Sequence, residues 1–365
     1  MKKTILFVAT VIIAVSAFSQ NTYYYISGKV IDAVSKQPLQ AASVFAQNTT
    51  QGAATDAAGN FKLGLPNGGY DLVITFTGYQ TETKRITTAD AADKNIVIEL
   101  KQKEKAMEDV VVRSTGEVKD GWEKYGDFFI ENFIGKTENS KNCSIKNKEA
   151  VHFYFSKKRN RLKVLATEPI EIENNALGYS IKYTVDSFTY EYNTQVSLYT
   201  GYPLFTEMQT TDTAKQHLWA VNRVKAYNGS LLHFMRSLHQ KKLKEEGFEI
   251  QFLIKNNDKE TAFPLLNFYG AVNYTKDDST NTVEVMPNQN DVVLIYNKAL
   301  PEENYLIANP DEPAKFQMSV LSFIPKQSLI IEENGYYFEQ TDIIINQYLG
   351  WKKMADMLPY DYKKD

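Results

Sequence analysis

The chain has almost none of the residues from which disulfides and metal sites are built. Of its 365 residues only Cys143 is a cysteine, and four are histidines. A single cysteine cannot form a disulfide within the chain, so its stability must come from packing. Catalytic zinc takes three protein ligands, and none of the histidines lies in an HExxH motif. We therefore expect no internal disulfide and no metal, and interpret Cys143 as a small, partly buried side chain.

The chain also lacks the short motifs that mark common cofactor and nucleophile sites. It has no GxGxxG turn, no phosphate-binding loop, no GxSxG turn and no CxxC pair. Lys and Arg number 41 against 44 Asp and Glu, a formal net charge of −3, which does not indicate a nucleic-acid partner. We accordingly expect no cofactor and assign no catalytic, cofactor-binding or metal-binding residue.

Only the N-terminus carries an apolar run of the kind that secretion requires. Lys2 and Lys3 precede the apolar residues 5–15, and Ala17-Phe18-Ser19 places small residues where a signal peptidase reads them. The run is shorter than the roughly 20 residues of a membrane-spanning helix, and no cysteine for lipid attachment follows. We predict a signal peptide over residues 1–19, cleaved after Ser19. The exported chain would be periplasmic or associated with the outer membrane, without a transmembrane helix.

Short strands separated by turn residues follow, a pattern typical of a β-sandwich. Phe61, Leu63 and Leu65 alternate with polar or small residues and so point to one face. Before them, Asp56 and Gly59 predict a chain reversal, because Asp bonds nearby backbone groups and Gly accepts positive φ. The predicted strands cover residues 26–31, 42–46, 61–65, 70–76 and 96–100.

This region, residues 24–101, resembles the carboxypeptidase-like regulatory domain, which also occurs at the N-terminus of many TonB-dependent outer-membrane receptors. The resemblance rests on Gly28-Lys29-Val30-Ile31-Asp32, Pro38-Leu39, Ala42-Ser43-Val44, Thr55-Asp56 with Gly59 and Phe61, and Gly78-Tyr79. Ala42 departs from the pattern, because glycine is common there, and so does the glycine-free turn Ala33-Val34-Ser35. The resemblance implies an immunoglobulin- or prealbumin-like sandwich that is accessory rather than catalytic.

A charged linker is predicted over residues 102–120. Within it, Met107 to Ser114 resembles the stretch that follows the same module in TonB-dependent receptors. Val110, Val111 and Val112 could therefore contact a partner by adding a strand to its sheet. We favour the alternative that this run pairs with the protein's own sheet, because proteins usually cover apolar strands. The 251 residues after Ser114 are too few for a plug and a large barrel, so we do not expect a complete receptor.

Residues 121–362 predict a second, antiparallel β-rich α+β domain with a helical insertion near residues 214–246. Aromatic spacing indicates a helix over residues 121–135, and alternation of period two begins at Val151. Helical periodicity covers residues 214–227 and 230–246, with Ser230 as N-cap and Gly247 as stop. The predicted strands cover residues 151–155, 170–173, 179–185, 188–192, 292–296, 316–324, 328–331 and 336–345, and a closing helix covers residues 351–358. The fold class is thus mainly β.

One cluster of basic residues in the helical insertion is a candidate anion-binding site. Arg223 lies near the end of the first predicted helix, and His233 and Arg236 lie close together on one face of the second. Together they would form an anion-binding patch, although such residues on amphipathic helices usually rest on the surface.

We expect a non-enzymatic envelope protein that binds other envelope proteins, among which outer-membrane receptor components are candidates. Two alternatives stay open. A hydrolase of glycan or peptide would need convergent carboxylates, and Glu171 and Glu173 share a strand face about 7 Å apart, but a solvated face explains them more simply. A small outer-membrane β-barrel over residues 150–345 would suit the alternating aromatics, but the helices of residues 214–246 and the charged Lys363-Lys364-Asp365 argue against it.

Overall fold

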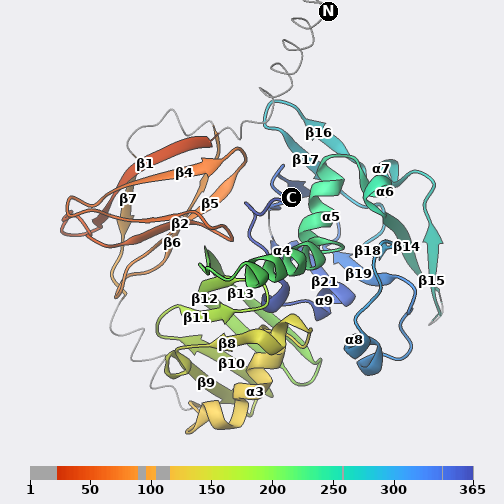
Figure 1. The fold of residues 1–365 in the computed structure, drawn as a ribbon, viewed down its shortest axis with the longest axis horizontal. Coiled ribbons are helices and arrows are strands. Elements are labelled where there is room, and N and C mark those ends of the chain that lie inside the picture. The colour runs from red at the N-terminus through yellow and green to blue at the C-terminus, as the bar shows by residue number, and fades with distance from the viewer. Residues whose placement is uncertain (1–22, 89–95, 104–115, 257–258, 339, 365) are drawn as a thin grey trace, which may run out of the picture.

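The computed structural model describes residues 23–88, 96–103, 116–256, 259–338 and 340–364. Figure 1 shows the N-terminal strands on one side of the molecule and the larger C-terminal region beside and below them. Three separate clusters of buried apolar side chains stabilise these parts. The mainly β class predicted from the sequence is confirmed.

The N-terminal part is a sandwich of two sheets. Its strands are β1 (Tyr23–Asp32), β2 (Ser43–Ala46), β3 (Gly52–Ala54), β4 (Asn60–Pro66), β5 (Tyr70–Thr75), β6 (Glu82–Ile86) and β7 (Ile96–Leu100). One sheet has the order β4-β1-β7, with β1 parallel to β7, and the other has the order β3-β2-β5-β6. Alternate residues of β1 and β4 point into the core between them, as their sequence pattern predicts.

The turn predicted between β3 and β4 is confirmed in detail. The Asp56 carboxylate accepts hydrogen bonds from the backbone N–H groups of Ala58 and Asn60, at 2.9 and 2.8 Å. Gly59 has a φ of 78°, which only glycine adopts without strain. The chain therefore reverses where the sequence predicted it.

A third sheet, of six strands, forms the first half of the C-terminal region. Its strands are β8 (Cys143–Ile145), β9 (Val151–Ser156), β10 (Arg161–Ala166), β11 (Ile170–Asn174), β12 (Tyr179–Glu191) and β13 (Val196–Glu207), with the 3-10 turns η3 (Asn139–Asn142) and η4 (Lys148–Ala150). The order is β8-β11-β12-β10-β9, and the long hairpin partner β13 pairs with β12. The helix α3 (Gly121–Phe133) packs Phe129 and Phe133 onto this sheet, and residues 121–135 were predicted as a helix.

The rest of the chain forms helices and two more sheets. The helices are α4 (Thr213–Tyr227), α5 (Leu231–His239), α6 (Leu243–Glu246), α7 (Phe268–Ala271), α8 (Glu303–Ala308) and α9 (Tyr348–Trp351), with η5 (Gln340–Asp342) and η6 (Met354–Asp356). The strands are β14 (Phe248–Asn256), β15 (Lys259–Pro264), β16 (Thr275–Asp277), β17 (Thr282–Val285), β18 (Asp291–Tyr296), β19 (Gln317–Phe323), β20 (Leu329–Ile331) and β21 (Ile343–Gln347). The sheet orders are β15-β14-β18-β19-β21 and β16-β17-β20, and α5 shares their core.

The predicted helix over residues 230–246 is interrupted. Ser230 caps α5 as predicted, accepting from the N–H of His233, and Gly247 ends α6 with a φ of 92°. Between them, Lys241 takes a φ of 61° and the Lys242 N–H donates to the Ser237 carbonyl. This is a left-handed helix end formed without glycine, so no glycine marks it in the sequence.

The predicted closing helix over residues 351–358 is wrong. The helix α9 ends at Trp351, and Lys353 is extended with φ −128° and ψ −149°. The Ala355 N–H donates to the Ile134 carbonyl beyond α3, and Asp356 accepts from the Thr137 hydroxyl. Tertiary hydrogen bonds thus replace the helical ones. Likewise, the strand predicted over residues 336–345 is formed only from Ile343 onward.

Candidate functional site at the junction of the sandwich and the C-terminal region

The turn between β2 and β3 joins the sandwich to the C-terminal region through backbone hydrogen bonds. The Asn48 N–H donates to the Pro203 carbonyl at 2.8 Å, and the Phe205 N–H donates to the Thr49 carbonyl at 2.9 Å. From the other side, the Tyr360 N–H donates to the Asn48 carbonyl at 2.7 Å. The turn therefore lies between β13 and the C-terminal segment, residues 359–364, and forms an isolated parallel bridge to β13 between Thr49 and Leu204.

The C-terminal segment reinforces this turn with a carboxylate. Asp361 accepts hydrogen bonds from the Thr50 N–H at 3.0 Å, from the Gln51 amide at 2.9 Å and from the Thr50 hydroxyl. Bonds to an ionised acceptor are stronger than neutral ones. The last described residues of the chain are thus part of the junction.

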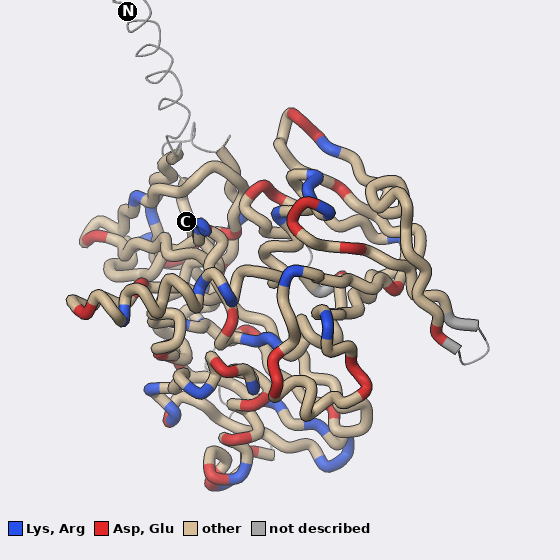
Figure 2. Tube along the Cα trace, turned by 45° about the vertical axis from the view of Figure 1, so that its right-hand side comes forward, with Lys and Arg blue, Asp and Glu red and all other residues tan. Residues whose placement is uncertain are grey.

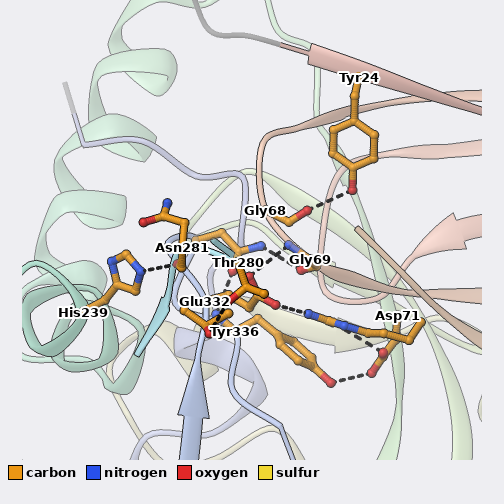
Figure 3. Close-up of polar contacts among 12 residues, drawn as sticks. Tyr24, Gly68, Gly69, Asp71, His239, Thr280, Asn281, Glu332 and Tyr336 are labelled. Atoms are coloured by element: carbon orange, nitrogen blue, oxygen red, sulfur yellow. Dashed lines mark hydrogen bonds and ion pairs between the residues drawn. The ribbon is translucent and has the colours of Figure 1, made fainter. Parts of the chain in front are cut away.

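A second set of contacts converges on Arg85 of β6, and Figure 3 labels its neighbours Asp71, Glu332 and Tyr336. The Arg85 guanidinium forms an ion pair with Glu332 and a longer one, at 3.5 Å, with Asp71. It also lies over the rings of Tyr336 and Phe338, 4.4 and 4.3 Å from their centroids. Arginine suits such a place because it can stack and form ion pairs at once.

The partners of Arg85 are themselves held by hydrogen bonds. The Tyr336 hydroxyl donates to Asp71 at 2.6 Å, and burial together with this bond raises the pKa of Tyr336 well above its usual range. Glu332 is 5% exposed and accepts from the Gly69 N–H at 3.2 Å. The Asn334 amide donates to the Gly69 carbonyl. The turn after β20 therefore fits against the start of β5.

Arg236 of α5 links the two sets of contacts. Its Nε donates to the Asn334 carbonyl at 3.0 Å, and its two terminal nitrogens donate to the carbonyls of Tyr362 and Tyr360, both at 2.9 Å. One side chain thus fixes both the turn that contacts Arg85 and the C-terminal segment that contacts the β2–β3 turn.

A cleft of about 550 Å³ opens beside this junction. The sandwich contributes Thr50, β12 and β13 contribute Tyr179 and Glu207, α4 contributes five residues and the C-terminal segment contributes the rest. The lining residues are Thr50, Tyr179, Glu207, His217, Ala220, Val221, Arg223, Val224, Pro359, Asp361, Tyr362 and Lys363. Its wall combines charges of both signs with the exposed apolar side chain of Val221, which is 49% exposed. Such a mixture suits a polypeptide better than a small anion.

The predicted anion patch has its polar atoms engaged by the protein itself. Arg223 stacks on Tyr179 at 4.1 Å and donates to the Leu177 carbonyl at 2.7 Å and to Glu207 at 3.1 Å. His233 is 3% exposed, accepts from the Gly229 N–H at 3.1 Å and meets Glu246 at 3.1 Å.

Arg236 has the carbonyl partners given above. Among the described contacts, no hydrogen-bond partner is shared by any two of these three residues. Only Arg223 lines the cleft, so an anion patch stays a prediction.

The other predicted residues lie away from the junction or outside the described part. Glu173 pairs with Lys146 at 3.1 Å, and Glu171 lies 3.9 Å from Lys182, so both have lysine partners on a strand surface. Val110, Val111 and Val112 lie outside the described residues.

Cys143 lies in β8, beside the end of η3. Its thiol donates to the Asn139 carbonyl at 3.5 Å. Burial raises the pKa of the Cys143 thiol to about 12, so it is protonated at neutral pH.

A smaller pocket of about 360 Å³ lies at the start of α3. Its lining residues are Glu117–Trp122 and Val151–Phe153. His152 meets Glu117 at 3.0 Å across it, and both side chains are partly exposed.

Sequence reasoning missed the residues that matter most at the junction, namely Arg85, Asp71, Glu332 and Tyr336. Each is an ordinary polar or aromatic residue in a strand or turn, and their partners are up to 265 positions away. No sequence signal marked Arg85, because its partners Glu332, Tyr336 and Phe338 are more than 240 positions away along the chain.

Charges of both signs are interspersed along the trace (Figure 2). No group of three or more His, Cys, Asp or Glu side chains that could hold a metal ion occurs in the described residues. Within the same residues, no helix is both long and apolar enough to cross a membrane.

Comparisons with known proteins give one partial sequence match, two weak structural alignments and one family model. The chain is 31% identical over 118 residues to the TonB-dependent receptor SusC of Bacteroides thetaiotaomicron, a match that spans 32% of this chain and 11% of the receptor. Two solved structures align weakly. A 9R-lipoxygenase from Cyanothece PCC8801 aligns over 60% of this chain and 48% of its own (6% identity, TM-score 0.17). A protein of unknown function from Bacteroides fragilis NCTC 9343 aligns over 89% and 95% (11% identity, TM-score 0.16). At such scores neither bears on the fold.

The family model of the CarboxypepD_reg-like domain matches residues 26–112. The matched part begins within β1 and includes the other six strands of the sandwich. The N-terminal sandwich of this chain is therefore a carboxypeptidase-like regulatory domain.

Proposed function

We propose that this chain is an exported, non-enzymatic protein of the bacterial envelope that binds a protein partner. The match of about a third of the chain to a TonB-dependent receptor, together with the regulatory-domain family of the sandwich, supports the location, in the periplasm or at the outer membrane. The apolar N-terminus, which predicts a signal peptide cleaved after Ser19, supports export. The proposed units are a sandwich over residues 24–101, a linker over residues 102–120 and a β-rich domain over residues 121–362.

The observation that carries the proposal is the cleft beside the junction. Its wall contains residues from both parts of the chain, Thr50 from the sandwich and Arg223 and Asp361 from the C-terminal region. Backbone hydrogen bonds hold these parts together at Asn48 and Thr49. A binding surface shared by two folding units requires such fixed placement, because relative motion would separate its halves.

Site-specific photo-crosslinking in the native envelope tests the proposal. A photoreactive residue would replace His217 or Val221 in the cleft, and a matched control would replace Leu300, which is 67% exposed and does not line the cleft. We expect one envelope protein to be captured from both cleft positions and not from position 300. Mass spectrometry of the purified chain should also find Gln20 as its first residue.

Two results would contradict the proposal. Equal capture from position 300 would show that the cleft is not the binding surface. Release of sugar or peptide fragments from envelope material by the purified chain would support the hydrolase alternative instead.

A further inference from the structure

The strand β13 is an edge strand whose outer side is only partly covered. It pairs with β12 along its whole length. The turn between β2 and β3, called the sandwich turn below, covers its outer side at Pro203 and Phe205 through Asn48 and Thr49. Between Val196 and Tyr202, the described residues make one hydrogen bond to the backbone on this side, a long one of 3.5 Å from the Gln47 amide to the Gly201 carbonyl. Within the described part of the chain, about six residues of this strand edge therefore have no partner strand.

This edge lacks the features with which proteins usually prevent pairing. The ten residues from Val196 to Phe205 carry no charge. In comparison, the edge strands β6 and β15 contain charged residues, and the opposite edge of the same sheet, β9, is covered by residues 116–118. The uncharged strand β21 is shorter and runs directly into α9. Exposed, uncharged edges are templates for another strand.

The side chains and backbone groups of this edge have the spacing that pairing needs. Leu198 is 58% exposed and Val196 is 42% exposed, on the face away from the core. Because the backbone groups of Pro203 and Phe205 point outward to the sandwich turn, those of Ser197, Tyr199 and Gly201 point the same way. These three residues are symmetric about Tyr199.

We propose that β13 pairs with β13 of a second copy of this chain, antiparallel, with the two-fold axis at Tyr199. Ser197 then bonds to Gly201 of the copy, Leu198 lies opposite Thr200, and no like charges meet. The pairing ends at Tyr202, next to the residues that the sandwich turn already occupies, so it continues an existing interface along the same edge. Because Tyr199 is the middle residue of the stretch 196–202, a second copy pairs with this stretch over its whole length.

Sedimentation velocity of the purified mature chain is the first test. We expect a dimer, and Leu198→Lys should raise its dissociation constant about tenfold or more, because two lysines would face each other diagonally across the axis. Val97→Lys is the matched control, since Val97 is also a strand residue that is 58% exposed but lies in the sandwich. A monomeric wild type, or equal effects of both variants, would overturn the proposal.

Cysteine crosslinking tests the register and does not depend on dimer strength. Opposite positions across antiparallel strands place their Cβ atoms about 5 Å apart, within disulfide reach, and diagonal ones do not. A mixture of Leu198→Cys and Thr200→Cys chains should therefore crosslink at least about tenfold faster than either variant alone. The wild-type chain, whose only thiol is Cys143, is the control and should not crosslink under the same conditions. Crosslinking no faster in the mixture would overturn the two-fold at Tyr199.

Discussion

At the scale of single residues, Arg85 shows how a polar side chain becomes structurally important through its surroundings. The Glu332 side chain that it pairs with is 6% exposed, and Arg85 itself is 25% exposed. A carboxylate removed from water to this degree depends on its partner, because desolvation costs several kcal/mol. The pair therefore contributes mainly by preventing an unpaired buried charge.

We predict that Arg85→Ala lowers the free energy of unfolding by about 2–4 kcal/mol, since it leaves Glu332 buried without a cation. Urea denaturation measures this loss. Lys36→Ala is the control, because Lys36 and Glu99 form an ion pair whose side chains are 58% and 48% exposed, and its loss should cost about 0.5 kcal/mol or less. Similar costs for both substitutions would show that Arg85 is not a buried partner.

We predict that His233 makes the protein less stable in mild acid. Burial lowers the pKa of His233 below its usual value of 6.5, so the unfolded chain binds a proton more readily than the folded one. The contribution of neutral His233 is therefore complete above pH 6.5 and is lost as the pH falls below it. Protonation would also end the hydrogen bond that its Nδ1 accepts from Gly229.

The measurement is the free energy of unfolding between pH 5 and 8, about the range over which an ordinary histidine titrates. His233→Gln should flatten this profile below pH 6.5, whereas His217→Gln, at an exposed position of α4, should leave it unchanged. A profile that keeps its slope in His233→Gln would assign the effect to another group.

Residue types were easier to predict than their partners. Arg223, His233 and Arg236 were singled out because their chemistry is visible in the sequence, but that chemistry is satisfied by backbone carbonyls and Glu246. Which carbonyl an arginine meets depends on elements that are distant in sequence, such as the C-terminal segment for Arg236. A single sequence contains no signal for such pairings.

At the scale of elements, the sandwich depends on the close approach of β1 and β7. A Cβ at Gly28 would lie 2.3 Å from the Ile96 carbonyl oxygen and 2.8 Å from the Phe61 ring, so the backbones could not keep their spacing. A Cβ built at Gly78, in contrast, would meet no atom within 4 Å, but Gly78 has a φ of 81°. The two glycines are therefore required for different reasons, close packing at Gly28 and backbone conformation at Gly78.

We predict that Gly28→Ala destabilises the sandwich by about 3 kcal/mol, because overpacking forces backbone shifts. Gly78→Ala should cost only about 1 kcal/mol, the strain of an alanine at positive φ. Thermal unfolding followed by circular dichroism compares the two variants. A larger loss in Gly78→Ala would contradict this order.

Strands were predicted better than helix ends for a physical reason. Alternation in β1 and β4 is imposed by one buried face, and it is readable in any short window of sequence. After α5, the left-handed residue Lys241 is followed by Lys242, whose N–H donates to the Ser237 carbonyl. The break at Lys353 is accompanied by a bond from the Ala355 N–H to the Ile134 carbonyl, which is more than 200 positions away. The carboxypeptidase-like resemblance was specific because it combined several turn and strand signals, while the C-terminal region offered no comparable set.

At the scale of the whole molecule, Arg236 determines whether the junction acts as one unit. It holds the turn at Asn334, which contacts the sandwich at Gly69, and the segment at Tyr360, which contacts it at Asn48. Losing this side chain frees three carbonyls at once. Both contact sets should weaken together although Arg236 itself does not belong to the sandwich.

We predict that Arg236→Ala increases hydrogen exchange at the amides of Asn48 and Tyr360 by about tenfold or more, since opening of the junction becomes easier by at least about 1.4 kcal/mol. Amides in the sandwich core, such as those of β1 and β4, should keep their protection. Arg161→Ala is the matched control, because Arg161 of β10 forms an ion pair with Glu191 of β12, away from the junction. If Arg161→Ala accelerated the same amides, the two parts would be coupled through the sheet rather than through Arg236. Faster exchange in β1 as well would mean that the sandwich cannot remain folded without the C-terminal region.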